Sequence, residues 1–304
     1  MEKPALSGLQ LIRSFSILAS MSKKKPRPIP VPAHAIPGLI DAHTHIASCG
    51  ATEQDEVDAF VQRALAAGVE RICTVGDGLA EAESALQAAQ MNSRVFAACA
   101  IHPTRARELD QAARNRLTEM GHDPRCVAIG ETGIDTYWIT HDPDNTADLE
   151  TQEEALRWHI DLAVATGKAL MIHNREGDDH LMRILDDAPQ PPETILHCFS
   201  SPIDVAKQAL DRGYVLSFAG NVTFKRNEEL REAARIAPIS QLLIETDAPY
   251  MTPEPFRGAR NESAMIGHTA LCVASSREES VADCVAGVSA TFDRVYGVGA
   301  SFGA

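Results

Sequence analysis

Short apolar runs alternate with longer amphipathic segments along most of the chain, and this alternation predicts strands followed by helices. The apolar runs begin after Gly38 and predict eight strands, at residues 39–46, 71–75, 95–101, 127–134, 169–173, 194–199, 214–218 and 242–248. Helical periodicity fills the segments between them, for example 56–67 and 151–166, which end at Gly68 and Gly167. Eight strand–helix units, with strands apolar enough for burial on both faces, predict a single-domain TIM (β/α)8 barrel. An open doubly wound sheet is the alternative, but no Gly-x-Gly-x-x-Gly loop follows the first run.

The first 37 residues do not share this pattern. Three consecutive lysines at 23–25 and repeated prolines through Pro37 predict a disordered or extended N-terminal arm, followed by the barrel domain at 38–300. The apolar stretch at 9–18 is interrupted by Arg13 and makes a poor signal-peptide core. Met21 is an alternative start, which would exclude residues 1–20 from the protein.

Composition narrows the class of protein. Hydrophobic residues make up 44% of the 304 positions, which is enough for a sizeable core, and no apolar run has the length of a membrane-spanning helix. The 7 cysteines form no Cys-x-x-Cys pair, and four of them, Cys73, Cys99, Cys126 and Cys198, fall in apolar runs. We therefore expect reduced, buried thiols and a cytoplasmic protein. The net charge of -14 argues against a protein that binds nucleic acid through a broad basic surface. A nuclease stays possible, because bound metal cations and a few local basic residues can offset the charge of the substrate phosphates.

Ionisable residues gather at the predicted strand ends, which in a barrel face the active-site mouth. A single His-x-His pair is close to chance in a chain with 11 histidines. A carboxylate between apolar residues and glycines, however, is costly to bury unless it is paired or binds a metal. The set as a whole therefore predicts a metal site. Its members are His43, His45, His102, Glu131, Asp135, His173, Arg175, His197 and Asp247.

These ligand types indicate the chemistry. Imidazole combined with carboxylate suits Zn²⁺, Mn²⁺, Co²⁺ or Fe²⁺, and with added water also Mg²⁺. Two adjacent ions need a bridging group, and a bidentate carboxylate provides one. Such a pair would activate water and stabilise charge on both the attacking and the leaving oxygen. We therefore expect a hydrolase with two divalent metal ions, such as Mg²⁺, Mn²⁺ or Zn²⁺.

Seven motifs, taken in order, resemble those of the TatD family of metal-dependent deoxyribonucleases. The agreement runs from about Gly38 to Glu262, and the last motif is the most specific. The resemblance implies a TIM-barrel metallohydrolase of the amidohydrolase superfamily that cleaves DNA phosphodiester bonds, with single strands or 3′ ends as substrate. The motifs are Asp41-Ala42-His43-Thr44-His45, Ile101-His102-Pro103, Ile129-Gly130-Glu131-Thr132-Gly133-Ile134-Asp135, Ile172-His173-Asn174-Arg175, His197-Cys198-Phe199-Ser200, Val222-Thr223-Phe224-Lys225, and Glu245-Thr246-Asp247-Ala248-Pro249-Tyr250-Met251-Thr252-Pro253.

The resemblance also implies roles for individual residues. One metal would be held by His43, His45 and Asp247, the other by His173 and His197, with Glu131 binding or bridging both. Asp247 would also take the proton from the nucleophilic water. The expected substrate contacts are His102, Arg175, Lys225 and Arg257. Their alternatives are a strand-end cap for His102, an ordinary ion pair for Arg175, and solvated charge for Lys225 with Arg226 and for Arg257 with Arg260.

The chain departs from the family pattern away from the ligands. Ser263-Ala264-Met265 replaces a proline and an aromatic residue, Thr291 replaces an asparagine, Glu176-Gly177 stands where Asp-Ala is usual, and the acidic loop at 141–150 looks long. These differences concern the substrate and the C-terminal packing. No obligate protein partner is indicated.

Two other functions fit the same barrel. The first is a metallohydrolase acting on an ester or amide, such as a D-aminoacyl-tRNA deacylase or a lactonase, because a fold does not fix the substrate. Several such relatives bridge their metals with a modified lysine on strand four, where this chain has Glu131, and Lys168 lies just before strand five. The second is a non-enzymatic binding protein, although no predicted ligand is missing.

Overall fold

The computed structural model describes residues 29–299, and within them eight parallel strands form one sheet in the order β1 to β8. Neighbouring strands pair in sequence order, for example Cys73 of β2 with Phe96 of β3. The strands are β1 (Leu39–Thr44), β2 (Val69–Val75), β3 (Val95–Ala98), β4 (Cys126–Asp135), β5 (Ala169–Arg175), β6 (Thr194–Leu196), β7 (Val215–Phe218) and β8 (Leu242–Ile244).

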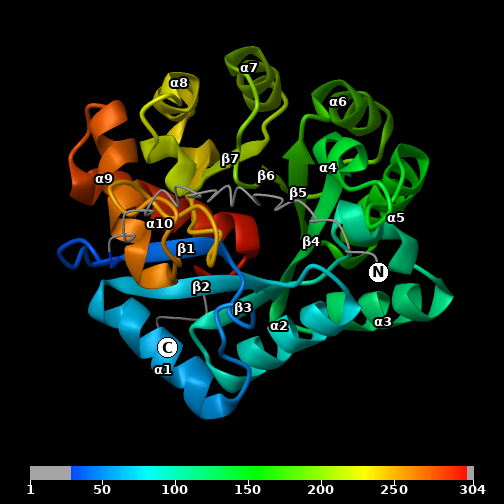
Figure 1. Cartoon of the computed structure of the whole chain (residues 1–304), viewed down its shortest axis with the longest axis horizontal. Helices are drawn as coiled ribbons and strands as arrows, with labels where there is room; N and C mark the ends of the chain where they lie inside the picture. Colours follow the sequence, from blue (N-terminus) through cyan, green and yellow to red (C-terminus); the bar gives the residue numbers. More distant parts are fainter. Residues whose placement is uncertain (1–28, 300–304) are drawn as a thin grey trace, which may run out of the picture.

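Helices follow the strands and surround them, as Figure 1 shows. The α-helices are α1 (Gln54–Ala66), α2 (Leu79–Met91), α3 (Gln111–Gly121), α4 (Thr136–His141), α5 (Leu149–Thr166), α6 (Asp178–Asp187), α7 (Ile203–Asp211), α8 (Glu228–Ile236), α9 (Ile266–Ser276) and α10 (Val281–Tyr296). Four 3₁₀ turns join them within the described residues: η1 (Pro103–Glu108), η2 (Gly220–Thr223), η3 (Ile239–Gln241) and η4 (Ser263–Met265).

The ends of β1 and β8 meet and bring the first and last units together. The backbone amide of His45 donates to the Ala248 carbonyl at 2.8 Å, and the amide of Asp247 donates to the His43 carbonyl at 2.9 Å. The sheet therefore curves into a barrel whose carboxyl-terminal edge places the segment after β8 beside the end of β1. The TIM-barrel prediction and all eight predicted strands are confirmed.

Element boundaries differ from the predicted ones where the chain leaves the barrel wall. Strands β1, β3, β6 and β8 end earlier than their apolar runs, because the last residues turn into the loops that carry the site. A short helix, α4, precedes the acidic loop and was not predicted. The side chain of Asp135 caps it by accepting a hydrogen bond from the amide of Trp138 at 2.8 Å. Residues 29–37 contain no helix or strand, and the rest of the predicted arm, 1–28, lies outside the described residues.

One continuous core fills the barrel interior and the layer between strands and helices. Phe60 on α1, Phe218 on β7 and Phe292 on α10 are among its largest fully buried side chains. Cys73, Cys99 and Cys126 are buried as expected, whereas Cys198 is half-buried because it turns out of β6 with φ 43°.

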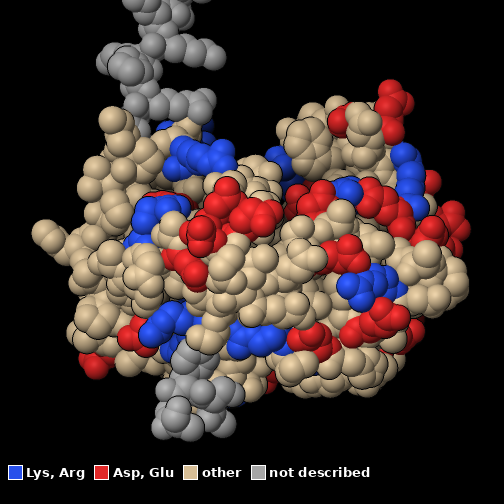
Figure 2. Space-filling view, turned by 90° about the horizontal axis from the view of Figure 1, so that it is seen from below, with Lys and Arg blue, Asp and Glu red and all other residues tan. Residues whose placement is uncertain are grey.

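Charge is distributed in small groups over the surface. On the face shown in Figure 2, which includes α1 and α2, acidic and basic side chains intermingle and basic ones form no continuous surface. This agrees with the net charge of -14. None of the helices in residues 29–299 has the length and apolarity needed to cross a membrane.

Candidate metal centre

Six predicted ligands converge at the carboxyl-terminal edge of the barrel. His43 and His45 come from the end of β1 and the residue beyond it, Glu131 and His173 from β4 and β5, and His197 and Asp247 from the loops after β6 and β8. All but His173 are buried, and His173 is half-buried.

Two glycines allow β4 to lie this close to β5. A Cβ atom on Gly130 would overlap the Met171 side chain, and one on Gly133 would overlap the His173 carbonyl. The Gly-Glu-Thr-Gly sequence of β4 thus brings Glu131 against its neighbours.

Each histidine of the first pair has one ring nitrogen fixed from outside the cluster. Nδ1 of His45 lies 3.2 Å from the carbonyl oxygen of Val75, which can only accept, so this nitrogen carries the proton. Nδ1 of His43 lies 3.1 Å from Sδ of Met171, a weak acceptor. The Nε2 atom of each ring therefore points into the cluster, where it can bind a metal ion in place of a proton.

The second pair is oriented by carboxylates. Nδ1 of His197 lies 3.2 Å from Oε1 of Glu245, and Nε2 of His173 lies 3.1 Å from Oδ2 of Asp135. The remaining nitrogens, Nε2 of His197 and Nδ1 of His173, face inward toward Glu131. A carboxylate behind each imidazole is the usual outer partner of a metal-ligating histidine.

The inward atoms of the first cluster are spaced like the ligands of one ion. Nε2 of His43 is 3.2 Å from Nε2 of His45. Oδ1 of Asp247 is 3.7 and 3.5 Å from these two nitrogens, and Oε1 of Glu131 is 3.8 and 3.6 Å from them. Donors about 2.1 Å from a tetrahedral ion lie about 3.4 Å from one another. This cluster therefore fits a divalent ion.

The second cluster uses the other oxygen of Glu131. Its Oε2 lies 2.8 Å from Nε2 of His197 and 3.4 Å from Nδ1 of His173, and these two nitrogens are 3.4 Å apart. Glu131 thus offers one oxygen to each cluster and joins the two groups of candidate ligands.

Electrostatics supports a cation among these acceptors. Burial lowers the pKa of His45, but its hydrogen bond to Asp247 and the charge of Glu131 raise the pKa to about 9. Burial acts to raise the pKa of Glu131, yet the charge of His197 holds it well below its usual range. Without metal, protons on the imidazoles provide the positive charge that these carboxylates require.

Another carboxylate lies at the rim of the first cluster. Oδ1 of Asp77, after β2, is 3.5 Å from Nδ1 of His45, and burial raises its pKa to about 6. Asp77, His45 and Glu131 could hold a metal by spacing alone. Because Nδ1 of His45 already donates to Val75, we assign Asp77 an orienting role behind His45.

His102 faces the cluster as a hydrogen-bond donor. Its Nδ1 accepts from the backbone amide of Thr104 at 3.3 Å, which caps η1 and leaves the proton on Nε2. Burial and the charge of His173 lower the pKa of His102 to about 3, so the ring is neutral. Its Nε2 lies 4.0 Å from Oε2 of Glu131. The two predicted alternatives for His102, cap and site residue, are therefore compatible.

The loop after β8 is held firmly in place. Oδ1 and Oδ2 of Asp41 accept from the amide and hydroxyl of Thr246 at 2.8 and 2.6 Å, and Oδ2 also accepts from Ser263 at 2.6 Å. Asn261 donates to the carbonyls of Thr246 and Tyr250 at 2.9 and 2.7 Å. Asp247 itself has φ 51°, a conformation that such anchors must maintain.

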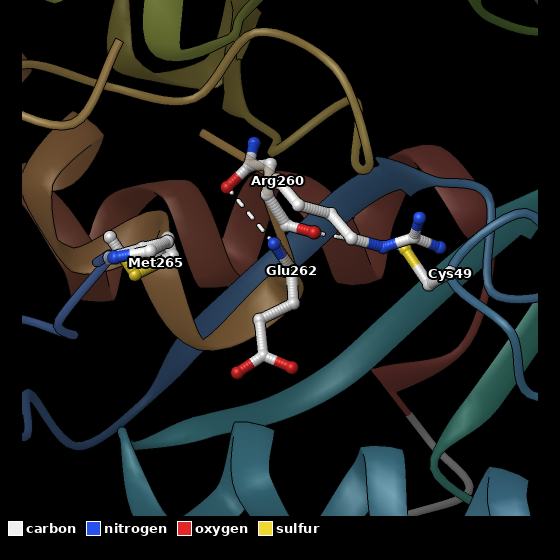
Figure 3. Close-up of a pocket in the computed structure, with 6 residues that line it drawn as sticks. Cys49, Arg260, Glu262 and Met265 are labelled. Carbon is white, nitrogen blue, oxygen red and sulfur yellow. Dashed lines mark hydrogen bonds between the residues drawn. The ribbon is translucent and has the colours of Figure 1, made fainter. Parts of the chain in front are cut away.

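A hollow beside these anchors is not part of the metal centre. It is lined by Pro30, Cys49, Arg260, Asn261, Glu262 and Met265. In Figure 3, Arg260 and Cys49 lie together at one end of it and Met265 at the other. None of the six ligand candidates lines it.

Four cations near the mouth stand apart from the others. Within residues 29–299, every other lysine and arginine donates a hydrogen bond or forms an ion pair, whereas Arg175, Lys225, Arg226 and Arg257 do neither. The guanidinium of Arg175 instead lies over the Tyr137 ring at 3.7 Å, and that of Arg257 over the Phe224 ring at 4.3 Å. Arg175 is the last residue of β5, and the other three residues follow β7 and β8.

Sequence reasoning assigned no role to the outer partners of the ligands. Glu245 and Asp77 are absent from the predicted set, and Asp135 belongs to it without an individual role. A signal existed for Glu245, which lies two residues before Asp247 in the same motif, but its contact with His197 depends on the fold.

The chain is similar to several known proteins. The family model described as TatD related DNase matches residues 40–297. An uncharacterized metal-dependent hydrolase TatD of Mycobacterium tuberculosis is 45% identical over 261 residues, covering 86% of this chain and 98% of the relative. A 3'-5' ssDNA/RNA exonuclease TatD of Enterobacter lignolyticus is 31% identical over 229 residues, covering 73% of this chain and 85% of that protein.

A solved structure agrees with the fold. The crystal structure of YJJV, a TatD homolog from Escherichia coli K12, superposes with a TM-score of 0.77 at 25% identity, covering 86% of this chain and 98% of that one. The ligand geometry, the matched family model and these relatives lead to one conclusion: the chain belongs to the TatD family and is a metal-dependent hydrolase.

Proposed function

We propose that this hydrolase cleaves phosphodiester bonds of DNA, with single strands or 3′ ends as substrate. The observation that carries the proposal concerns four cations that have no hydrogen bond or ion pair within residues 29–299. Arg175, Lys225, Arg226 and Arg257 lie at or after the carboxyl ends of β5, β7 and β8, the edge of the barrel that carries the metal centre. In a protein with net charge -14, unpaired cations at one place suit an anionic substrate. The ssDNA/RNA exonuclease among the relatives supports the same substrate class.

We assign His43, His45 and Asp247 to one divalent ion and His173 and His197 to the other, with Glu131 serving both. Bound there, the ions would activate water and neutralise charge on phosphate oxygens. Asp247, which is 8% exposed, accepts the proton of the attacking water.

Substrate contacts complete the proposal. His102 donates its Nε2 proton to a phosphate oxygen, a role that suits a neutral imidazole whose other nitrogen is already engaged. Arg175, Lys225 and Arg257 contact the phosphates of the flanking nucleotides.

The lysine-bridged chemistry of some ester and amide hydrolases has no support here. Lys168 precedes β5, at the opposite end of the barrel from the mouth, and its Nζ lies 3.5 Å from the Asp123 carbonyl. Strand β4 instead presents Glu131 to both clusters.

The test is hydrolysis of 5′-labelled single-stranded and duplex oligonucleotides by protein loaded with Mg²⁺, Mn²⁺ or Zn²⁺. We expect cleavage that EDTA abolishes and that Asp247→Asn reduces by at least about 100-fold. Lys225→Ala with Arg257→Ala should flatten the salt dependence of kcat/KM by about one logarithmic slope unit per cation. Arg235→Ala, which removes a cation paired with Glu232 on α8, is the matched control. Folded, metal-loaded protein that cleaves an ester or amide but no nucleic acid would disprove the proposal.

A further inference from the structure

Two exposed aromatic side chains lie at the mouth, one on each side of the metal centre. Trp138 on α4 is 38% exposed, and Tyr250 in the loop after β8 is 52% exposed. The Tyr250 ring is 6.0 Å from that of His45, in the first cluster. Trp138 lies beside the second cluster, because its helix begins directly after Asp135, the partner of His173. Tyrosine and tryptophan side chains are enriched at binding surfaces, because each combines a large apolar ring with a polar group.

Helix α4 presents a stacked arrangement of rings rather than a single side chain. Tyr137 stacks on His141 with ring centroids 3.9 Å apart and planes at 14°. Arg175 lies over Tyr137 at 3.7 Å and over Trp138 at 5.5 Å. Because Arg175 forms no hydrogen bond or ion pair within residues 29–299, its N–H groups are available to a phosphate while its face is held by the rings.

Both aromatic residues are attached to the ligand framework. The amide of Trp138 donates to Oδ1 of Asp135 at 2.8 Å, and the other oxygen of that carboxylate holds His173. The amide of Tyr250 donates to the Asp247 carbonyl at 2.8 Å, and its own carbonyl accepts from Asn261 at 2.7 Å. The backbone that carries each ring is therefore anchored to one of the two clusters, so a group stacked on either ring would lie near the bond that is cleaved.

We propose that Trp138 and Tyr250 are stacking platforms for unpaired nucleobases on the two sides of the scissile phosphate, with Arg175 holding the phosphate next to Trp138. The inference rests on the proposed phosphodiesterase function. Stacking of one base on an aromatic side chain strengthens binding by about 5- to 150-fold and tolerates any base sequence. Bases inside a duplex stack on their neighbours and cannot use these platforms, so the subsite selects single strands.

The first test measures binding without catalysis. The chain has 2 tryptophans, so Trp158→Phe leaves Trp138 as the only indole. Its fluorescence is followed in EDTA, where no cleavage is expected, on mixing with a thymidine tetranucleotide, a uridine tetranucleotide, and a base-free tetramer of the same phosphate charge. We expect quenching and at least 5-fold tighter binding by a base-bearing chain than by the base-free one. A preference between thymidine and uridine chains would identify DNA or RNA as the source. Equal quenching and equal affinity for all three chains would overturn the proposal.

The second test measures catalysis. Trp138→Ala and Tyr250→Ala should each lower kcat/KM on the base-bearing chain by 5-fold or more and leave the base-free chain unaffected, and Trp138→Phe should restore most of the loss. Leu271→Ala, which removes a side chain that is 42% exposed on α9, is the control. Equally fast cleavage of both chains would refute the platforms but leave the phosphodiesterase. Base-dependent quenching without cleavage of any chain would retain the platforms and refute the phosphodiesterase.

Discussion

Glu245 tests whether a residue outside the ligand set controls the metal centre. Its side chain is fully buried and accepts three hydrogen bonds, from Nδ1 of His197 at 3.2 Å, from the amide of Cys198 at 2.8 Å and from the hydroxyl of Ser217. In Glu245→Gln the amide oxygen keeps the first two bonds, and the amide nitrogen can donate to the Ser217 oxygen. The substitution therefore removes the negative charge behind His197 with little change of shape.

The size of the effect follows from these contacts. Loss of a charged partner behind a metal-ligating histidine lowers metal affinity by about 10- to 100-fold, so we expect that loss for Glu245→Gln with less than about 1.5 kcal/mol of destabilisation. Glu245→Ala instead leaves three buried donors without an acceptor, at about 1 to 3 kcal/mol each, and should lower the free energy of unfolding by about 3 kcal/mol or more.

The assay is a competition titration of Zn²⁺ against a chromophoric chelator, run beside urea denaturation of the metal-free protein. Glu193→Gln is the matched control, because Glu193 pairs with Arg294 and precedes β6, at the end of the barrel away from the mouth. Metal affinity of Glu245→Gln within twofold of the unsubstituted protein, in a normally folded sample, would refute the orienting role of Glu245.

The metal centre gives two further predictions. EDTA should lower the melting temperature measured by calorimetry. Zn²⁺ or Mn²⁺ should restore the melting temperature more fully than Ca²⁺, because Ca²⁺ prefers six to eight oxygen ligands. Equal recovery with Ca²⁺ would contradict the imidazole-rich ligand set. In metal-free protein, burial lowers the pKa of His45, but Asp247 and Glu131 raise it to about 9. The folded protein therefore keeps a proton on His45 up to about pH 9, whereas the unfolded chain releases it near the ordinary histidine pKa of 6.5. Stability should be full below pH 6.5 and fall by roughly 3 kcal/mol as the pH rises to 9, and His45→Asn should remove most of this slope in urea titrations.

The barrel and the ligand candidates could be predicted because both depend on local pattern. Buried parallel strands are nearly continuous apolar runs, and functional residues follow strand ends. His43, Glu131 and Asp247 stood out by these two rules alone. Helix α4 could not be predicted in this way, because six residues give too little periodicity and Thr136-Tyr137-Trp138 has weak helix propensity. Its capping residue Asp135 was visible in the sequence, but a cap alone does not define a helix.

Outer contacts depend on distances between strands that no local pattern contains. Glu245 reaches His197 across 48 positions of the chain, and Met171 reaches His43 across 128. The register of the barrel brings them together, so they became evident only in the fold.

The anchors of the β8 loop explain why the metal centre keeps its geometry in an acidic protein. Asp41 and Asn261 fix Thr246 and Tyr250 on either side of Asp247, so the carboxylate stays within 3.7 Å of His43 although its neighbourhood is negative. A loosely held carboxylate would turn to solvent when the site is metal-free and would have to be ordered again at each binding event. The net negative charge of the protein repels polyanions, whereas Arg175 and Arg257 have no ion pair within residues 29–299. Productive contact with an anionic chain is therefore favoured at the edge of the barrel where these fixed ligands lie. The acidity of the protein and its proposed action on nucleic acid are therefore consistent.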